Sequence, residues 1–276
     1  MQIREYSLPA GWFPRDPDSV AAFLSEFTGQ DLPNGSSRAA IAPHAGWYYC
    51  GHIAARAVLS LNPDADTVAV LGGHLQAGSP PLFAMEDAVK TPFGNIRIDS
   101  EFRSILFDEL KGAEDRYRDN TVEVLLPMVH YLFPKANLLW LRLPADNRSF
   151  DAGRVISGAA SKLNLRVNVL ASTDLTHYGP NYGFVPHGTG KDALRWVREE
   201  NDARLIKAIE TGGNSEVLRC AEQDSSACSA GAVLGAMGFA DAEGLGRARL
   251  LEYGTSADVD GGKVPDSFVG YAAMQF

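Results

Sequence analysis

The sequence predicts an α/β fold, with a central, largely parallel or mixed sheet flanked by helices. Short apolar runs of strand length alternate along the chain with longer segments whose apolar residues recur at helical spacing. This alternation is typical of a sheet whose two faces are covered by helices. At 276 residues, without an internal repeat, linker or low-complexity tract, we expect residues 1–276 to form one domain.

Apolar runs predict the strands. Pro43 cannot donate a ladder hydrogen bond, so the first strand should end before it. The last two apolar runs along the chain are expected to form the final strands of the sheet. The predicted strands are 39–42, 67–71, 138–143, 166–173, 248–253 and 268–274.

The segments between these runs predict helices. Asp16 is placed to cap the first helix, with Pro17 at its first position. Pro127 should kink the helix that contains it. Residues 29–37 are predicted to be a loop, and residues 80–94 an irregular or hairpin segment. The predicted helices are 17–27, 53–61, 100–110, 121–133, 150–163, 191–209 and 228–239.

Composition excludes some classes of partner. The net charge of −9 comes without any basic block, which argues against nucleic acid as a general partner. The three cysteines have no framework spacing and predict reduced thiols. No apolar run is long enough to span a bilayer, and the first residues lack the pattern of a signal peptide. We therefore expect a soluble cytoplasmic protein with no membrane partner.

Ionisable side chains follow three of the predicted strands. His44 follows the first, His74 the second, and Asp174 and His177 the fourth. The carboxyl ends of parallel strands share one edge, where ligands collect in open α/β sheets. Converging imidazoles and a carboxylate can form a metal site or an acid/base site. The alternative is that each is a loop residue with ordinary hydrogen-bond partners.

Two further features allow both a functional and a structural interpretation. Cys228 lies near the start of a predicted helix, where a thiolate is favoured as a ligand or nucleophile, but it could be a small core residue. Trp12, Tyr48 and Tyr49 could line a pocket or simply pack.

Several motifs together resemble the Memo-like family, which includes protein B of the AmmeMemoRadiSam system. The resemblance runs from about residue 9 to the C-terminus. Its most specific parts are Pro43-His-Ala-Gly and the block that begins at Ser172. In chain order the motifs are Pro9-Ala-Gly-Trp-Phe-Pro, Ala42-Pro-His-Ala-Gly-Trp-Tyr-Tyr-Cys-Gly51, Leu71-Gly-Gly-His74, Lys90-Thr-Pro-Phe-Gly94, Ser172-Thr-Asp-Leu-Thr-His-Tyr178 and the Cys228 segment.

The resemblance implies a fold similar to that of class III extradiol dioxygenases, which use non-haem Fe(II). Position by position, it also implies roles for individual residues. The implied metal ligands are His44, His74 and Cys228; the implied acid/base pair is Asp174 and His177; the implied substrate-binding residues are Trp12, Tyr49 and Glu123.

The chain departs from the family pattern at two places. Gly72-Gly73-His74 is one residue shorter than the usual Gly-Pro-x-His. Asn120 stands where the family has a histidine in Glu-His-Ser-(Leu/Ile)-Glu, while Glu123 keeps the last acid of that motif.

Two histidines and a cysteine would leave coordination positions open, as catalytic sites do. The resemblance implies Fe(II), while a thiolate ligand also suits Cu or Zn. We expect a redox or dioxygenase-like enzyme acting on a small-molecule or peptide ligand, with a radical SAM protein as an implied partner. Ring cleavage is a poor default, because thiolate replaces the usual carboxylate. One alternative is a peptide- or protein-binding module without functional metal. Another is metal-free hydrolysis, with Cys228 as nucleophile and His177 as base.

Overall fold

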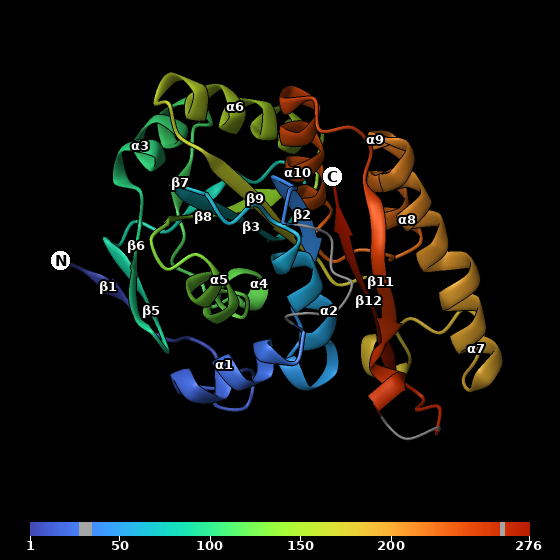
Figure 1. Cartoon of the computed structure of the whole chain (residues 1–276). Coiled ribbons are helices and arrows are strands. Elements are labelled where there is room, and N and C mark those ends of the chain that lie inside the picture. The colour runs from blue at the N-terminus through green and yellow to red at the C-terminus, as the bar shows by residue number, and fades with distance from the viewer. Residues whose placement is uncertain (28–34, 260–262) are drawn as a thin grey trace.

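A mixed sheet with helices on both faces forms the core of the structure (Figure 1). The structure is a computed structural model that describes residues 1–27, 35–259 and 263–276. Most of the predicted loop 29–37 therefore lies outside the described residues. The fold class predicted from the sequence is confirmed.

Four parallel strands occupy the middle of the sheet, in the order β2, β9, β3 and β8. Antiparallel pairing flanks them, because β12 runs against β2 and β4 runs against β8. The strands are β2 (Ala39–Ala42), β9 (Val167–Ser172), β3 (Thr67–Leu75), β8 (Asn137–Pro144), β12 (Phe268–Gln275), β11 (Arg249–Thr255), β10 (His177–Tyr178), β4 (Leu82–Phe83) and β7 (Ala113–Glu114). A separate small sheet contains β1 (Ile3–Arg4), β5 (Ala88–Thr91) and β6 (Gly94–Arg97).

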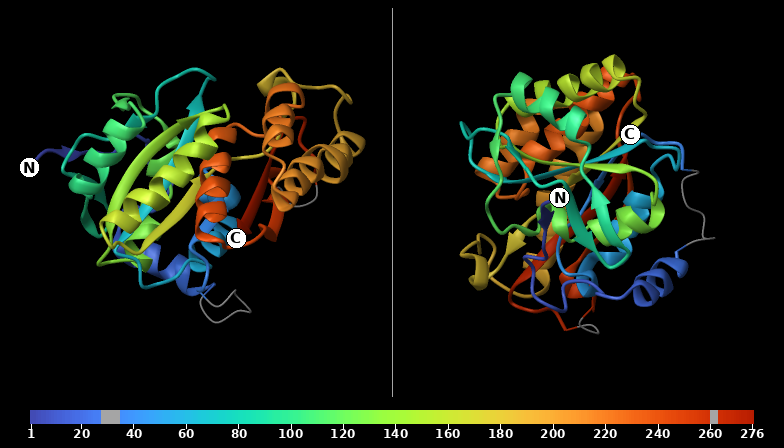
Figure 2. Two further views of the ribbon diagram at one scale, coloured as in Figure 1. Left: turned by 90° about the horizontal axis from the view of Figure 1, so that it is seen from above. Right: turned by 90° about the vertical axis from the view of Figure 1, so that its left-hand side faces the viewer.

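The helices cover the two faces of the central sheet (Figure 2). One face carries α3 (Ser100–Glu109), α6 (Arg148–Lys162) and α10 (Ala230–Glu243), with α9 (Asn214–Gln223) packed beside α10 and α8 (Asp202–Thr211) packed beside α9. The other face carries α1 (Pro17–Ser25), α2 (Trp47–Leu59), α4 (Asn120–Glu123) and α5 (Leu126–Leu132). The helix α7 (Lys191–Trp196) precedes α8. Within the described residues, none of the helices has the length and apolar character needed to cross a membrane.

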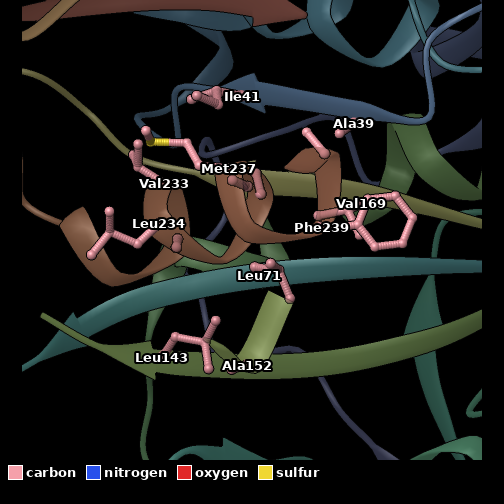
Figure 3. Packing of buried hydrophobic residues seen from close by; sticks show 14 of the residues in the cluster. Ala39, Ile41, Leu71, Leu143, Ala152, Val169, Val233, Leu234, Met237 and Phe239 are labelled. Carbon is pink, nitrogen blue, oxygen red and sulfur yellow. The ribbon is translucent and has the colours of Figure 1, made fainter. Parts of the chain in front are cut away.

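Successive side chains of the inner strands point to opposite faces of the sheet, and this creates two apolar cores. In β3, Ala69 and Leu71 pack on the side of α10, whereas Val68 and Val70 pack on the side of α2. Figure 3 shows Leu71 opposite side chains of α10. That helix is buried all round from Ala230 to Ala240, which explains why its sequence is small and apolar without a polar face.

Several predicted elements differ in detail from the observed ones. Pro127 does not kink one helix; it lies in the first turn of α5, which is separate from α4, because proline suits a helix start. The helix predicted at 53–61 begins earlier, at Trp47. The helix predicted at 191–209 contains a π-helical segment at Val197–Asn201, and α9 was not predicted.

Candidate functional site

The carboxyl ends of the parallel strands bring the predicted ligands together. His44 lies two residues after β2, Asp174 two residues after β9, and His74 at the end of β3. Cys228 lies two residues before α10 and joins them from the neighbouring helix layer. His44, His74 and Cys228 each offer one potential ligand atom, and these three atoms lie within 4.8 Å of one another.

His44 is the buried member of this cluster, with 1% of its surface exposed. Its Nδ1 lies 2.9 Å from Ser172 Oγ, and its Nε2 lies 3.2 Å from Cys228 Sγ. Its backbone is also held, because its N–H donates to Asp174 Oδ1 at 2.7 Å and its carbonyl accepts from Asn120 Nδ2 at 3.0 Å. The ring therefore presents Nε2 toward the sulfur from a fixed backbone.

His74 reaches the cluster through an irregularity in β3. Its φ is +57°, and the register against β8 shifts between Gly72 and Leu75. The sequence-based interpretation ended the strand at Leu71, but β3 continues to Leu75 and contains His74. The bulge turns the imidazole so that its ring centroid lies 5.0 Å from that of His44, at an interplanar angle of 87°.

Two glycines make this approach sterically feasible. A Cβ on Gly73 would lie 2.5 Å from Ser229 Oγ and 2.7 Å from Ser229 Cα, and one on Gly72 would lie 2.9 Å from Val122 Cγ2. All three distances are far inside van der Waals contact, so only glycine lets β3 pack against α4 and against the residue next to Cys228. The short Gly-Gly-His segment thus delivers His74 to the cluster.

Cys228 is held by the end of β9. Its N–H donates to the carbonyl of Asp174 at 3.3 Å, and its Sγ accepts from the Asp174 N–H at 3.3 Å. Burial alone raises the pKa of the Cys228 thiol, but the imidazoles of His44 and His74 more than offset this and lower that pKa well below its usual value. The site therefore favours the thiolate, which is the form that binds metal.

The donor set fits a mononuclear ion. His74 Nδ1 lies 2.9 Å from Asp119 Oδ2, and since a carboxylate only accepts, Nδ1 carries a proton and Nε2 is the nitrogen that would give up its proton to an ion. In metal sites the second ring nitrogen of a ligating histidine usually has such a partner. Three protein ligands with open positions are typical of catalytic sites, whereas structural sites are closed.

A cavity of about 670 Å³ lies beside the cluster. Of the predicted site residues, Asp174, His177, Trp12 and Tyr49 line it. Asn120, the residue that departs from the family pattern, lines it as well. The remaining lining residues are Ala10, Gly11, Ala45, Gly46, Asn181, Tyr182, Ser256, Pro265, Ser267, Val269 and Tyr271.

The two members of the predicted acid/base pair have different hydrogen-bond partners. The Asp174 carboxylate accepts from the backbone N–H of His44, and His177 Nδ1 lies 3.2 Å from the carbonyl of Leu175. A carbonyl only accepts, so His177 carries its proton on Nδ1 and keeps Nε2 free to receive one. Burial raises the pKa of the Asp174 carboxyl, although His44 lowers it.

The aromatic residues separate into different environments. Trp47 is buried, and its Nε1 donates to the carbonyl of Val124 at 2.9 Å, so it belongs to the core. Tyr48 is 67% exposed and does not line the cavity. Sequence reasoning missed Tyr182 and Tyr271 in the cavity wall. Tyr182 could have been found because it lies only four residues after Tyr178, the last residue of the Thr-His-Tyr block.

Glu123 lies outside the cavity lining. It is 3% exposed, and its carboxylate accepts from the N–H groups of Ser7 at 2.8 Å and Leu8 at 3.1 Å. The residue thereby fixes the N-terminal segment that leads to Trp12. Its substrate-binding role stays a prediction.

A buried carboxylate that sequence reasoning missed lies beneath the segment carrying Asp174 and His177. Asp202 accepts from the Thr176 N–H at 3.1 Å, from the Thr176 hydroxyl, and from the Tyr253 hydroxyl at 2.8 Å. It directly follows the π-helical segment. Burial raises the pKa of Asp202 to about 6, although these hydrogen bonds lower it.

Fold and site define an α/β protein with a candidate mononuclear metal centre at the carboxyl edge of its parallel strands. The chain belongs to the Memo-like protein family, whose family model matches residues 4–275. The resemblance predicted from the sequence motifs is thereby confirmed.

Individual relatives agree with this membership. The chain is 32% identical to a MEMO1 family protein of Thermococcus onnurineus (strain NA1) and 31% identical to one of Pyrococcus abyssi (strain GE5 / Orsay), with 98% of both chains covered in each case. A solved structure of an uncharacterized protein from Escherichia coli K12 aligns at a TM-score of 0.46 and 12% identity, covering 86% of this chain and 99% of that one.

Proposed function

We propose that this chain is a metal-dependent redox enzyme that holds one ion through His44, His74 and Cys228. The observation that carries the proposal is the approach of three potential ligand atoms to within 4.8 Å, beside a cavity lined by Asp174 and His177. Fe(II) is our first choice of ion, on the resemblance to extradiol dioxygenases, with Cu and Zn as alternatives that thiolate ligation supports.

When bound, Fe or Cu would supply redox chemistry at its open coordination positions, and Zn would supply Lewis-acid chemistry alone. The protein's own contribution is to fix the three ligands and to keep the sulfur deprotonated. Neighbouring imidazoles lower the pKa of the Cys228 thiol, and the hydrogen bonds of His74 with Asp119 and Cys228 raise the pKa of His74 despite its burial.

His177 is the residue we assign to proton transfer. Its Nδ1 is engaged by the Leu175 carbonyl, so the free Nε2 is the atom that would take a proton from a ligand in the cavity and return it later. Trp12, Tyr49 and Tyr182 supply ring surfaces against which a small molecule or a peptide side chain could pack. A radical SAM protein remains the partner class that the family resemblance suggests.

Metal content of purified and reconstituted protein tests the proposal. We expect one bound ion per chain in the wild type and its loss in Cys228→Ser. Cys220→Ser is the matched control, because it makes the same substitution at a cysteine that lies in α9, outside the cluster. His177→Ala should keep the ion and lose turnover.

Each unexpected result has a specific meaning. A folded wild type that takes up no metal contradicts the proposal and favours the peptide- or protein-binding alternative. Loss of the ion in His177→Ala would make His177 a ligand and not a proton carrier. Inactivation by a thiol reagent that added metal fails to prevent would favour Cys228 as a metal-free nucleophile.

A further inference from the structure

We infer that Asp119 and Arg142 are positioning residues that together hold His74 in the orientation needed for metal binding. The inference rests on the proposed metal centre and concerns how that centre is built. Of the two histidines, His74 needs such support more, because its side chain is 33% exposed whereas that of His44 is 1% exposed. Its backbone also has a φ of +57°, which is uncommon for a non-glycine residue.

Asp119 fixes the ring of His74. Its Oδ2 accepts from His74 Nδ1 at 2.9 Å, which leaves Nε2 as the ring nitrogen that would bind the ion. Its Oδ1 accepts from the Thr121 N–H at 2.9 Å and from the Thr121 hydroxyl, so the start of α4 fixes the carboxylate in turn. The side chain is 8% exposed, which limits the number of orientations it can adopt.

Arg142 supports both the backbone and the ring of His74. From the inner strand β8, its Nε donates to the carbonyl of Gly73 at 3.0 Å, the residue directly before His74. Its Nη2 lies 3.1 Å from Asp119 Oδ2, the oxygen that also bonds His74. One planar guanidinium therefore ties the bulge in β3 to the carboxylate that orients the imidazole.

A second buried acid fixes the guanidinium itself. Asp115 Oδ1 lies 3.2 Å from Arg142 Nη1, and Asp115 Oδ2 accepts from Trp140 Nε1 at 3.0 Å. The side chains of Asp115 and Arg142 are 0% and 4% exposed. Burying such charges costs free energy unless each is paired and hydrogen-bonded. The arrangement meets that condition and directs one arm of the guanidinium at the metal site.

A purely structural ion-pair network is the competing interpretation, and the affinity for Co²⁺ separates the two. Co²⁺ is the probe because a bound thiolate gives it a near-ultraviolet charge-transfer band. The variants are Asp119→Ala, Asp119→Asn and Arg142→Lys, each checked for folding by circular dichroism. Asp66→Ala is the matched control, since Asp66 also pairs with an arginine, Arg166 at 2.7 Å, but lies just before β3, at the opposite end of that strand from His74.

We expect Asp119→Ala to weaken the Co²⁺ affinity by about 10- to 100-fold, as loss of such outer partners does in metal sites. Asp119→Asn should lose less, because its amide oxygen still accepts from His74. Arg142→Lys should also weaken binding, because an ammonium cannot reach Gly73 and Asp119 in one plane. The charge-transfer band should persist in the bound fraction, and Asp66→Ala should bind as the wild type does.

The inference is overturned if folded Asp119→Ala binds Co²⁺ as tightly as the wild type does. If that variant does not fold, the same result in both Asp119→Asn and Arg142→Lys overturns it. Neither result would contradict the proposed metal centre. A wild type that binds no Co²⁺ overturns the metal proposal and this inference with it.

Discussion

Replacing Gly73 by alanine should open the candidate metal centre. The new Cβ would lie 2.4 Å from Ser229 Cβ and 2.7 Å from Ser229 Cα, whereas ordinary contact begins near 3.4 Å. Because neither atom can rotate away, β3 and the segment before α10 must separate by about 1.0 Å, the difference between 2.4 Å and 3.4 Å. Overpacking of this kind costs about 1–3 kcal/mol of unfolding free energy.

The same displacement acts on the ligands, because Gly73 precedes His74 and Ser229 follows Cys228. Ligand distances in metal sites hold to about 0.2 Å, so a separation of this size should prevent both side chains from reaching one ion. We expect Gly73→Ala to unfold at lower urea concentration and to bind Co²⁺ weakly or not at all.

Two companion variants make the measurement specific. Ser229→Gly removes the hydroxyl that would lie 2.5 Å from the new Cβ, so the double variant Gly73→Ala/Ser229→Gly should recover part of both losses. Gly158→Ala, in α6, adds the same methyl group to open space and should stabilise the chain by about 0.5–1 kcal/mol. Wild-type stability and Co²⁺ affinity in Gly73→Ala would refute the steric reasoning. Reduced stability with unchanged affinity would refute its link to the site.

Three further predictions follow from burial and charge. The imidazoles of His44 and His74 lower the pKa of the Cys228 thiol, whereas burial raises that of Cys50. In the metal-free protein, iodoacetamide should therefore alkylate Cys228 faster than Cys50. Mass spectrometry of the labelled peptides checks this, and faster labelling of Cys50 would contradict it. Because burial raises the pKa of Asp202 from 3.8 to about 6, the native state keeps a proton that the unfolded chain releases, and unfolding free energy should fall by up to about 3 kcal/mol as pH rises through that window. Urea unfolding of Asp202→Asn should show a smaller fall over the same pH range, and equal slopes would argue against this origin. Leu71→Ala, at a fully buried position between β3 and α10, should lower unfolding free energy by about 2–5 kcal/mol in the same assay, and a loss below 1 kcal/mol would show that the core collapses around the gap.

The local pattern of apolar residues was sufficient to predict the inner strands and the sheet edge at which the cluster of His44, His74 and Cys228 lies. The run 39–42 is apolar on every residue because both faces of β2 are covered, and the polar residue after it must then lie at the sheet edge. The same reasoning applied to 67–71 and 166–173 placed His74 and Asp174 at that edge. The placement of Cys228 among them came from the family resemblance, because its local sequence is equally typical of a core residue.

The contacts that support the site depend on residues far apart in the chain. Arg142 occurs within an apolar strand, and no local pattern indicates that it reaches Gly73, 69 residues away. The bulge at His74 depends on the register between β3 and β8, which the sequence of either strand alone does not specify. Asp202 is polar, so the pattern of apolar residues in its helix does not mark it as buried. Its burial arises from packing against Thr176 and Tyr253.

The separation of the ligands along the chain has a consequence for biosynthesis. His44 and Cys228 are 184 residues apart, so a nascent chain that ends before Cys228 cannot assemble the donor set. An ion could therefore bind all three ligands only after Cys228 has been synthesised and β2, β3 and β9 have paired, which distinguishes this architecture from zinc fingers that fold around their ion. Loading would then act on strands that are already paired, and would add about 2.7 kcal/mol of stability when the free ion is present at a hundred times its dissociation constant.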